Sequence, residues 1–194
     1  GYLIAPWYSG LTDAVAIKLL LRAYVVTNEK RYFGAASRLY DSVLKPIEKG
    51  GALIHDKAGN PWIEEYIARN SKNNPFVLNG MIYATLAIWD YERFITVKRP
   101  MGNKLIQTIK IRLPEFDAGY YTRYDLIGTL AKPKYHFIHV ALMEMLYHET
   151  NDPYFFEMAS RWGKYNSHFF TRYFLKKNVT VNSLVVLSIS FGIL

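Results

Sequence analysis

The sequence of 194 residues contains no cysteine. This absence excludes disulfide bonds, thiolate catalysis and metal sites built on cysteine. Low-complexity segments are also absent, which favours a folded chain over a disordered one. The longest apolar run, near 185–194, is shorter than the roughly 20 residues that a membrane-spanning helix requires. No glycine-rich phosphate loop is present, and Gly50-Gly51 is interpreted as the end of a helix.

A secretory signal peptide is another feature that the sequence does not show. The chain begins with Gly1 rather than methionine, and no charged start is followed by an apolar stretch. We therefore expect a processed or truncated piece of a longer protein. The lack of cysteine leaves the compartment open, because a reducing cytosol and a disulfide-free secreted protein both fit.

Acidic residues are in the minority. The chain has 16 Asp and Glu against 24 Lys and Arg, which gives a formal net charge of +8. Such an excess favours an anionic partner, namely a polysaccharide, a nucleic acid or a membrane surface. It also fits a basic surface that only keeps the protein in solution. The basic residues are spread along the chain without a clustered arm, so a nucleic acid is the least favoured partner.

What the sequence does contain is an alternation of two kinds of predicted helix. The first kind is apolar on nearly all faces, which predicts a helix covered on most sides. The second kind is apolar on one face only, as is typical of a surface helix. The segments of the first kind are 9–27, 76–94 and 135–148. The segments of the second kind, each following one of the first, are 29–49, 101–113 and the helix that starts at Pro153.

This alternation predicts an all-α fold. Repeated helical hairpins, each with one inner and one outer helix, are typical of an α/α toroid, and three of them make an open arc. The alternative is a compact bundle without ring character. Thr27-Asn28 and Thr150-Asn151 hold matching positions between the helices of the first and third hairpins. We place this domain at 1–168, with short strands in its loops, and expect 169–194 to be an apolar tail whose β-branched residues favour a strand.

Two polar and aromatic loops, 52–74 and 115–134, each join an outer helix to the next inner helix. In a hairpin toroid such loops lie at the same mouth of the ring, where functional residues gather. Carboxylates beside aromatic rings suit carbohydrate chemistry, because a ring stacks on a sugar face and an acid moves a proton. The alternative is a solvated acidic turn whose two aromatic rings, Trp62 and Tyr66, fold back onto the core. The side chains expected to converge are Glu64, Glu65, Tyr66, Tyr120, Tyr121, Arg123, Tyr124, Tyr135 and His136.

An ordered set of short motifs carries a family resemblance. The motifs are Trp62-Ile63-Glu64-Glu65-Tyr66, Val77-Leu78-Asn79-Gly80, Tyr124-Asp125-Leu126, Tyr135-His136 with His139, and Arg161-Trp162. In this order they resemble the C-terminal domain of D-glucuronyl C5-epimerases, over about 7–165. The resemblance implies an α/α toroid. It also implies inversion of C5 of glucuronate to iduronate within a heparan-type polymer, without a cofactor, and suggests the secretory lumen or the cell envelope.

The resemblance also implies roles for individual residues. Glu65 and Tyr135 would form the opposed acid/base pair, while Tyr66 and Tyr124 would bind or polarise the substrate carboxylate. The expected substrate contacts are Trp62, Glu64, Tyr120, Arg123 and His136. His136 and His139 lie three residues apart, but two histidines without a third ligand predict core residues rather than a metal site.

The sequence also departs from the family pattern. Ile127 stands where the family has an arginine after the Tyr124-Asp125-Leu126 motif, and Arg123 is the candidate substitute. Ile67 replaces a proline of the family pattern, and the segment between Tyr124 and Tyr135 is shorter than the corresponding segment of the family. The expected substrate is an acidic uronate polysaccharide, with an N-terminal region or a homodimer completing the cleft. The alternatives are a uronate lyase or glycosidase of toroid fold, and a binding module without catalysis.

Overall fold

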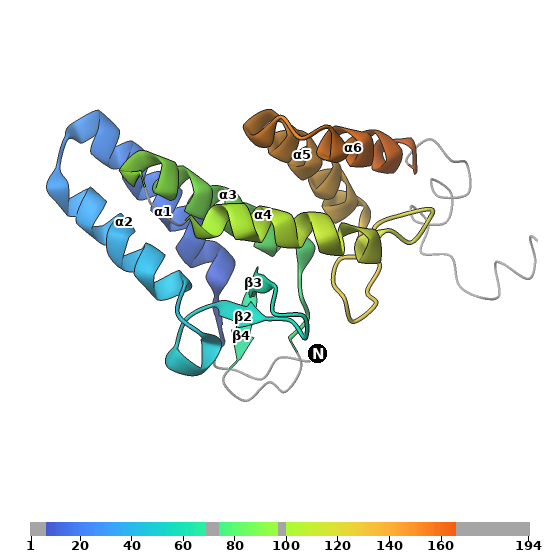
Figure 1. Cartoon of the computed structure of the whole chain (residues 1–194), viewed down its shortest axis with the longest axis horizontal. Helices are drawn as coiled ribbons and strands as arrows, with labels where there is room; N and C mark the ends of the chain where they lie inside the picture. Colours follow the sequence, from blue (N-terminus) through green and yellow to red (C-terminus); the bar gives the residue numbers. More distant parts are fainter. Residues whose placement is uncertain (1–6, 69–73, 97–99, 166–194) are drawn as a thin grey trace, which may run out of the picture.

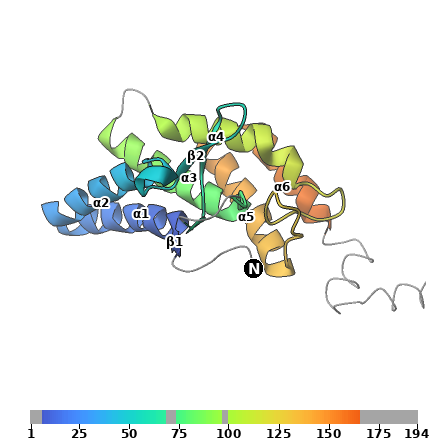
Figure 2. The same ribbon diagram turned by 90° about the horizontal axis from the view of Figure 1, so that it is seen from below.

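The computed structural model describes residues 7–68, 74–96 and 100–165, which form six α-helices in three consecutive pairs. α1 packs on α2, α3 on α4 and α5 on α6. α3 also packs against α1 and α5, so it lies between the outer pairs (Figures 1 and 2). The prediction of a mostly helical fold is confirmed. The helices are α1 (Gly10–Thr27), α2 (Lys30–Val43), α3 (Leu78–Ile95), α4 (Met101–Arg112), α5 (Pro133–Thr150) and α6 (Pro153–Tyr165).

The strands of the described residues are short and form two separate antiparallel pairs, β1 with β4 and β2 with β3. Ser9 pairs with Tyr66, which brings the start of α1 beside the first polar loop. The Gly10 N–H donates to the Glu65 carbonyl at 3.1 Å. The loop that carries the two glutamates is thereby fixed at the N-terminal end of α1. The strands are β1 (Trp7–Ser9), β2 (Leu53–His55), β3 (Pro61–Ile63) and β4 (Tyr66–Ala68).

The same tight turn joins the helices of the first and third pairs. Asn28 ends α1 and Asn151 ends α5, with left-handed φ angles of 57° and 55°. Each N–H donates to the carbonyl four residues earlier at 2.7 Å. Thr27 and Thr150 each accept the N–H two residues further on, at 3.2 and 3.1 Å. Asparagine tolerates the left-handed region, so this pair of polar residues determines where each helix stops.

The second helix is shorter than predicted, because α2 ends at Val43 rather than near residue 49. Pro46 explains the difference: a proline disfavours the helical conformation of the residue before it and has no N–H to donate. Pro46 itself is extended, with ψ at 149°. Only a 3-10 turn, η1 (Ile47–Lys49), follows it.

The third helix begins at Leu78, two residues later than predicted. Phe76 has a φ of 55°, in the left-handed region, and therefore does not belong to the helix. The Leu78 N–H donates to the Tyr124 carbonyl at 3.1 Å, and the Leu126 N–H donates to the Pro75 carbonyl at 2.9 Å. The stretch before α3 thus pairs with the second polar loop instead of continuing the helix backwards.

α1 and α5 are less covered than predicted. Val15, Leu19 and Val26 of α1 are 43%, 68% and 84% exposed, and α5 exposes Phe137 and Met145. α3, which has a helical neighbour on each side, is buried on most faces. Within the described residues, no helix has the length and apolar character needed to cross a bilayer. The tail predicted at 169–194 lies outside these residues, and the domain limits stay a prediction.

A buried carboxylate joins three of the helices. Glu92 of α3 accepts the Tyr40 hydroxyl of α2 and the N–H groups of Met101 and Gly102, each at 2.7 Å. Pro100 precedes α4 without a side-chain cap, so Glu92 supplies the acceptor for the free N–H groups of that helix. The charge of Glu92 also lies at the positive end of the α4 dipole.

Glu92→Gln is therefore expected to lower the free energy of unfolding by about 2 kcal/mol, because charge-assisted bonds to buried N–H groups are lost. Urea unfolding followed by circular dichroism measures the change. Glu157→Gln, on the exposed side of α6, is the matched control and is expected to change little. Equal unfolding midpoints for the two variants would contradict the role given to Glu92.

Candidate active site

Glu65 lies between β3 and β4, with its carboxylate against the first turn of α3. Oε2 accepts the Asn79 side-chain amide at 3.2 Å, and the Gly80 N–H also bonds the carboxylate. Val77 precedes α3 without a side-chain cap, so Glu65 supplies an acceptor for the start of this helix. Gly80 leaves the room for it, since an added Cβ would lie 2.5 Å from the Glu65 Cβ. The Glu65 carboxylate is thus held in one place.

Two tyrosines, Tyr66 and Tyr124, lie near this carboxylate, and a third, Tyr135, packs on one of them. The Tyr66 hydroxyl bonds Glu65, and it lies 3.1 Å from the Tyr124 hydroxyl. The Tyr124 and Tyr135 rings meet edge to face, with centroids 4.8 Å apart. An ionised carboxylate only accepts, so Tyr66 donates to Glu65 and its oxygen accepts from Tyr124. The structure therefore places Tyr66 and Tyr124, the predicted partners of the substrate carboxylate, at Glu65, and places Tyr135, the predicted second member of the acid/base pair, against Tyr124.

Burial controls the protonation of this cluster. It raises the pKa of Glu65 above its usual value, against the hydrogen bonds from Tyr66, Asn79 and Gly80 that lower it. Burial also raises the pKa of Tyr66 to about 12 and raises that of Tyr124 further, with Glu65 adding to both shifts. Near neutral pH both phenols are protonated and donate, while the carboxylate is the group that accepts a proton.

Trp62 does not offer the open ring that the sequence predicts. Its side chain has no exposed surface. It stacks on Phe116 at 6.0 Å and meets Phe76 edge to face at 5.5 Å. Trp62 and its neighbour Ile63 in β3 are both fully buried, so the strand is covered at this position and the ring belongs to the core. The structure gives no support to a stacking contact between Trp62 and a sugar, which stays a prediction, and shows the ring packed against Phe116 and Phe76 instead.

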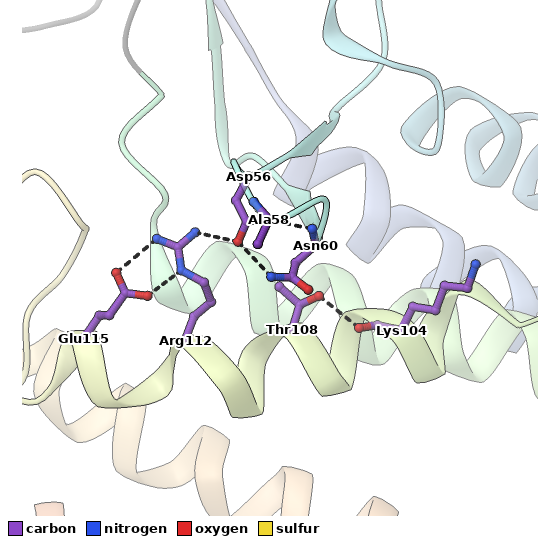
Figure 3. A network of polar contacts seen from close by, with 7 residues as sticks. All are labelled: Asp56, Ala58, Asn60, Lys104, Thr108, Arg112 and Glu115. Carbon is purple, nitrogen blue, oxygen red and sulfur yellow. Dashed lines mark hydrogen bonds and ion pairs between the residues drawn. The ribbon is translucent and has the colours of Figure 1, made fainter.

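An ion-pair network anchors the first polar loop to α4. The Arg112 guanidinium donates to both carboxylate oxygens of Glu115, at 2.6 and 3.1 Å, and to Asp56 at 3.3 Å (Figure 3). Asp56 also accepts the Ala58 and Asn60 N–H groups at 2.9 Å, which closes the turn between β2 and β3. The guanidinium lies over the ring of Phe76 as well. The network therefore stabilises the scaffold of the site.

Two further predicted substrate contacts lie in the second polar loop, which folds back on itself through bridges between residues 117 and 122 and between 123 and 130. The Arg123 guanidinium donates to the carbonyls of Glu115 and Asp117 at 2.9 and 3.0 Å. It is used within its own loop, so its role as a substitute for the missing family arginine is not supported. Tyr120 is 53% exposed and Ile127 is 51% exposed.

His136 belongs to a buried relay. Its Nε2 lies 3.1 Å from the Trp162 carbonyl, which only accepts, so Nε2 carries the proton. Nδ1 of the neutral ring then accepts the Thr122 hydroxyl at 2.9 Å, and His139 donates from its Nδ1 to the same hydroxyl at 2.9 Å. Burial lowers the pKa of both histidines, that of His139 to about 3, so both rings are neutral.

This relay fixes the second polar loop to α5 and α6. His136 has no exposed surface and its ring stacks on Tyr121, so the structure gives no support to a contact between His136 and substrate, which stays a prediction. Both histidines are core residues, as the sequence predicts. Among the described residues, no group of three or more His, Asp or Glu side chains is placed to hold a metal ion.

Sequence reasoning missed the residues that hold Glu65 in place. Asn79 and Gly80 were noticed only as part of a motif, without a role. A glycine inside a helix costs stability relative to alanine, so its presence in the first turn of α3 was a signal of close packing. Thr122 was also missed, because nothing in the sequence shows that two histidines converge on one hydroxyl.

Comparisons with known proteins show the family of this chain. The model of the D-glucuronyl C5-epimerase C-terminus matches residues 1–164. An uncharacterized protein of Methanocaldococcus jannaschii is 32% identical, over 80% of this chain and 51% of its own length. A D-glucuronyl C5-epimerase of Caenorhabditis elegans is 27% identical, over 80% of this chain and 28% of its own length. The chain thus spans about half, or less, of these relatives, and it belongs to the family of the D-glucuronyl C5-epimerase C-terminal domain.

Proposed function

We propose that this chain carries the acid/base residues of a uronate C5-epimerase that acts on an acidic polysaccharide without a cofactor. The observation that carries the proposal is the buried Glu65 carboxylate, held on the start of α3 and bonded by Tyr66, which in turn meets Tyr124, the ring on which Tyr135 packs. Membership of the epimerase family and the net charge of +8 both favour an anionic sugar polymer.

The proposed reaction needs a base and an acid on opposite faces of the sugar. Glu65 takes the C5 proton, and the electron pair moves into the adjacent substrate carboxylate. Tyr135 then gives a proton to the other face of C5, and exchange with solvent restores both groups. Tyr66 and Tyr124 are protonated near neutral pH. When the substrate binds, their O–H groups turn away from Glu65 and Tyr66, which accept them in this structure, and donate to the substrate carboxylate, where they stabilise the charge that develops.

We also propose that the three helical pairs are an arc of an α/α toroid. The packing of α3 against both α1 and α5 supports this proposal, in which α1, α3 and α5 are successive inner helices and the second helix of each pair is an outer one. The apolar residues that α1 and α5 expose are then the faces on which further parts of the full protein pack. An N-terminal region or a second copy of the chain is the proposed partner that completes the cleft.

A binding module without catalysis is the second candidate. Ile127 replaces the family arginine, and Arg123 is engaged with carbonyls of its own loop. A site that lacks this cation has less to stabilise the charge on the substrate carboxylate. Such a protein would bind the polymer and leave its C5 protons untouched.

The deciding experiment is proton exchange at C5. The protein is incubated with a glucuronate polymer such as heparosan in deuterated water, and the C5 signal is followed by NMR. Loss of the signal with new iduronate resonances supports the epimerase. Binding without exchange supports the module, and absorbance from an unsaturated sugar would identify a lyase. A full-length relative run in parallel separates an incomplete site from an inactive one.

A further inference from the structure

Glu64, the neighbour of Glu65, has a completely buried carboxylate. Oε1 accepts the N–H of Glu65 at 3.0 Å, and Oε2 accepts the N–H of Phe76 at 3.0 Å. The N–H groups of Tyr66 and Val77 bond it as well. Burying a carboxylate is costly unless hydrogen bonds satisfy it. Here the bonds come from two separate segments, so the carboxylate joins them.

One of these segments contains a strained residue. Phe76 has a φ of 55°, which is uncommon for a bulky side chain and persists only where the surroundings hold it. Its N–H is held by Glu64, and its ring is held between Trp62 and the Arg112 guanidinium, 5.1 Å from the ring centre. The backbone of 75–78 is therefore fixed in one conformation, with Glu64 on one side.

The other side of the same segment holds the second polar loop. The Leu78 N–H donates to the Tyr124 carbonyl, and the Leu126 N–H donates to the Pro75 carbonyl. Across the site, the Tyr124 hydroxyl meets that of Tyr66 at 3.1 Å. Hydrogen bonds thus link Glu64 to 75–78, 75–78 to the second polar loop at Tyr124, and Tyr124 to Tyr66, which is close to Glu64 in the chain.

We propose that Glu64 is a positioning residue that sets the distance between Glu65 and Tyr124 by holding 75–78 against both polar loops. We propose this positioning role in place of the substrate contact that the sequence suggested for Glu64, because a fully buried carboxylate reaches no ligand in this conformation. The expected effect on rate rests on the proposed function. The geometric coupling between the two loops does not depend on it.

Glu64→Gln in the whole chain tests the proposal. Glutamine keeps the shape but places an NH₂ group where one carboxylate oxygen accepted backbone N–H groups. The hydrogen bonds from one of the two segments are therefore lost. We expect kcat for C5 exchange to fall about 100-fold, the order expected for a displacement of reacting groups by about 1 Å, with KM nearly unchanged. Glu92→Gln is the matched control, since Glu92 is also a buried carboxylate that binds backbone N–H groups, at the other end of α3. A purely structural role predicts that both variants lose stability and neither loses kcat.

Amide resonances in ¹⁵N NMR spectra give a readout that needs no catalysis. Glu64→Gln is expected to move the resonances of Tyr124 and Leu126 along with those of Glu65 and Phe76, whereas Glu92→Gln moves none of them. Shifts confined to Glu65 and Phe76 would overturn the coupling. If the wild type shows no exchange but the distant shifts are present, the proposed function fails and the coupling holds. Should Glu64→Gln not fold, Glu64→Asp, which is one methylene shorter, serves for both readouts.

Discussion

Glu65→Gln is expected to abolish C5 proton exchange, with a loss of at least about 1,000-fold, within the range that a positioned base contributes. Glutamine fits the same space but has no basic oxygen of comparable strength. The bonds from Asn79 and Gly80 need an acceptor, which the glutamine carbonyl still supplies, so the fold is expected to persist. Deuterium incorporation at C5 measures the change. Exchange at the wild-type rate would remove Glu65 from the acid/base pair.

Stability provides the control for this variant. Burial raises the pKa of Glu65, which means that folding disfavours its charged form. A neutral glutamine relieves this cost, so Glu65→Gln is expected to unfold at the same urea concentration as the wild type or a higher one. Loss of activity without loss of stability is the pattern of a functional residue. A large drop in stability would instead indicate that Glu65 is a structural cap of α3.

The pH dependence follows from the same shift. Glu65 acts as a base only when ionised, so the exchange rate is expected to fall as the pH drops through its raised pKa, above the ordinary range of a glutamate. Tyr66 loses its proton only near pH 12, so its titration produces no alkaline loss near neutrality. A pH–rate profile in deuterated buffers measures the acid limb. A rate that stays constant down to pH 4 would contradict the assignment of the base.

Local signals in the sequence predicted most helices, but not all of their limits. Asn28 and Asn151 mark helix ends because the left-handed conformation is a property of single residues, and the structure has the same turn at both. The apolar periodicity of 29–49 predicted a helix that continues through Pro46, whereas the proline makes α2 end at Val43. The start of α3 was misplaced because Glu64 holds Phe76, and the second polar loop holds its neighbours Pro75 and Leu78, through contacts between segments far apart in the sequence.

The candidate site was predicted in part for the same reason. Motif order predicted Glu65, Tyr66, Tyr124 and Tyr135 as site residues, and the structure places Tyr66 and Tyr124 near Glu65, with Tyr135 against Tyr124. Residue type alone did not distinguish a ring that faces a ligand from one that packs in the core. Trp62 and His136 have the chemistry of sugar contacts but are fully buried. Burial depends on which segments cover a side chain, and that depends on the tertiary fold.

Gly80→Ala is expected to lower the rate of C5 exchange by at least about 100-fold while the helix remains intact. Alanine stabilises a helix by roughly 1 kcal/mol relative to glycine, so the substitution is expected to stabilise α3 itself. The new Cβ, however, would lie 2.5 Å from the Cβ of Glu65 and overlap its carboxylate, which must move away. Glu65 then loses its bonds to Asn79 and the Gly80 N–H, and the misplaced base no longer reaches the C5 proton. Exchange kinetics and far-UV circular dichroism measure the two effects.

Two other helical glycines separate the possible causes of such a loss. At Gly34 of α2 the nearest atom to an added Cβ is Arg38 Nη1 at 3.6 Å, an ordinary contact, so Gly34→Ala is expected to keep the full rate. At Gly102 of α4 the added Cβ would lie 2.9 Å from Glu92 Oε2, so Gly102→Ala is expected to lose stability but not rate. Equal rates for all three variants would mean that the packing of the Glu65 side chain against Gly80 of α3 does not matter for the reaction. A loss of exchange rate in Gly80→Ala alone would show that the reaction depends on the position of Glu65, because Gly80 is the one of these three glycines that packs against Glu65.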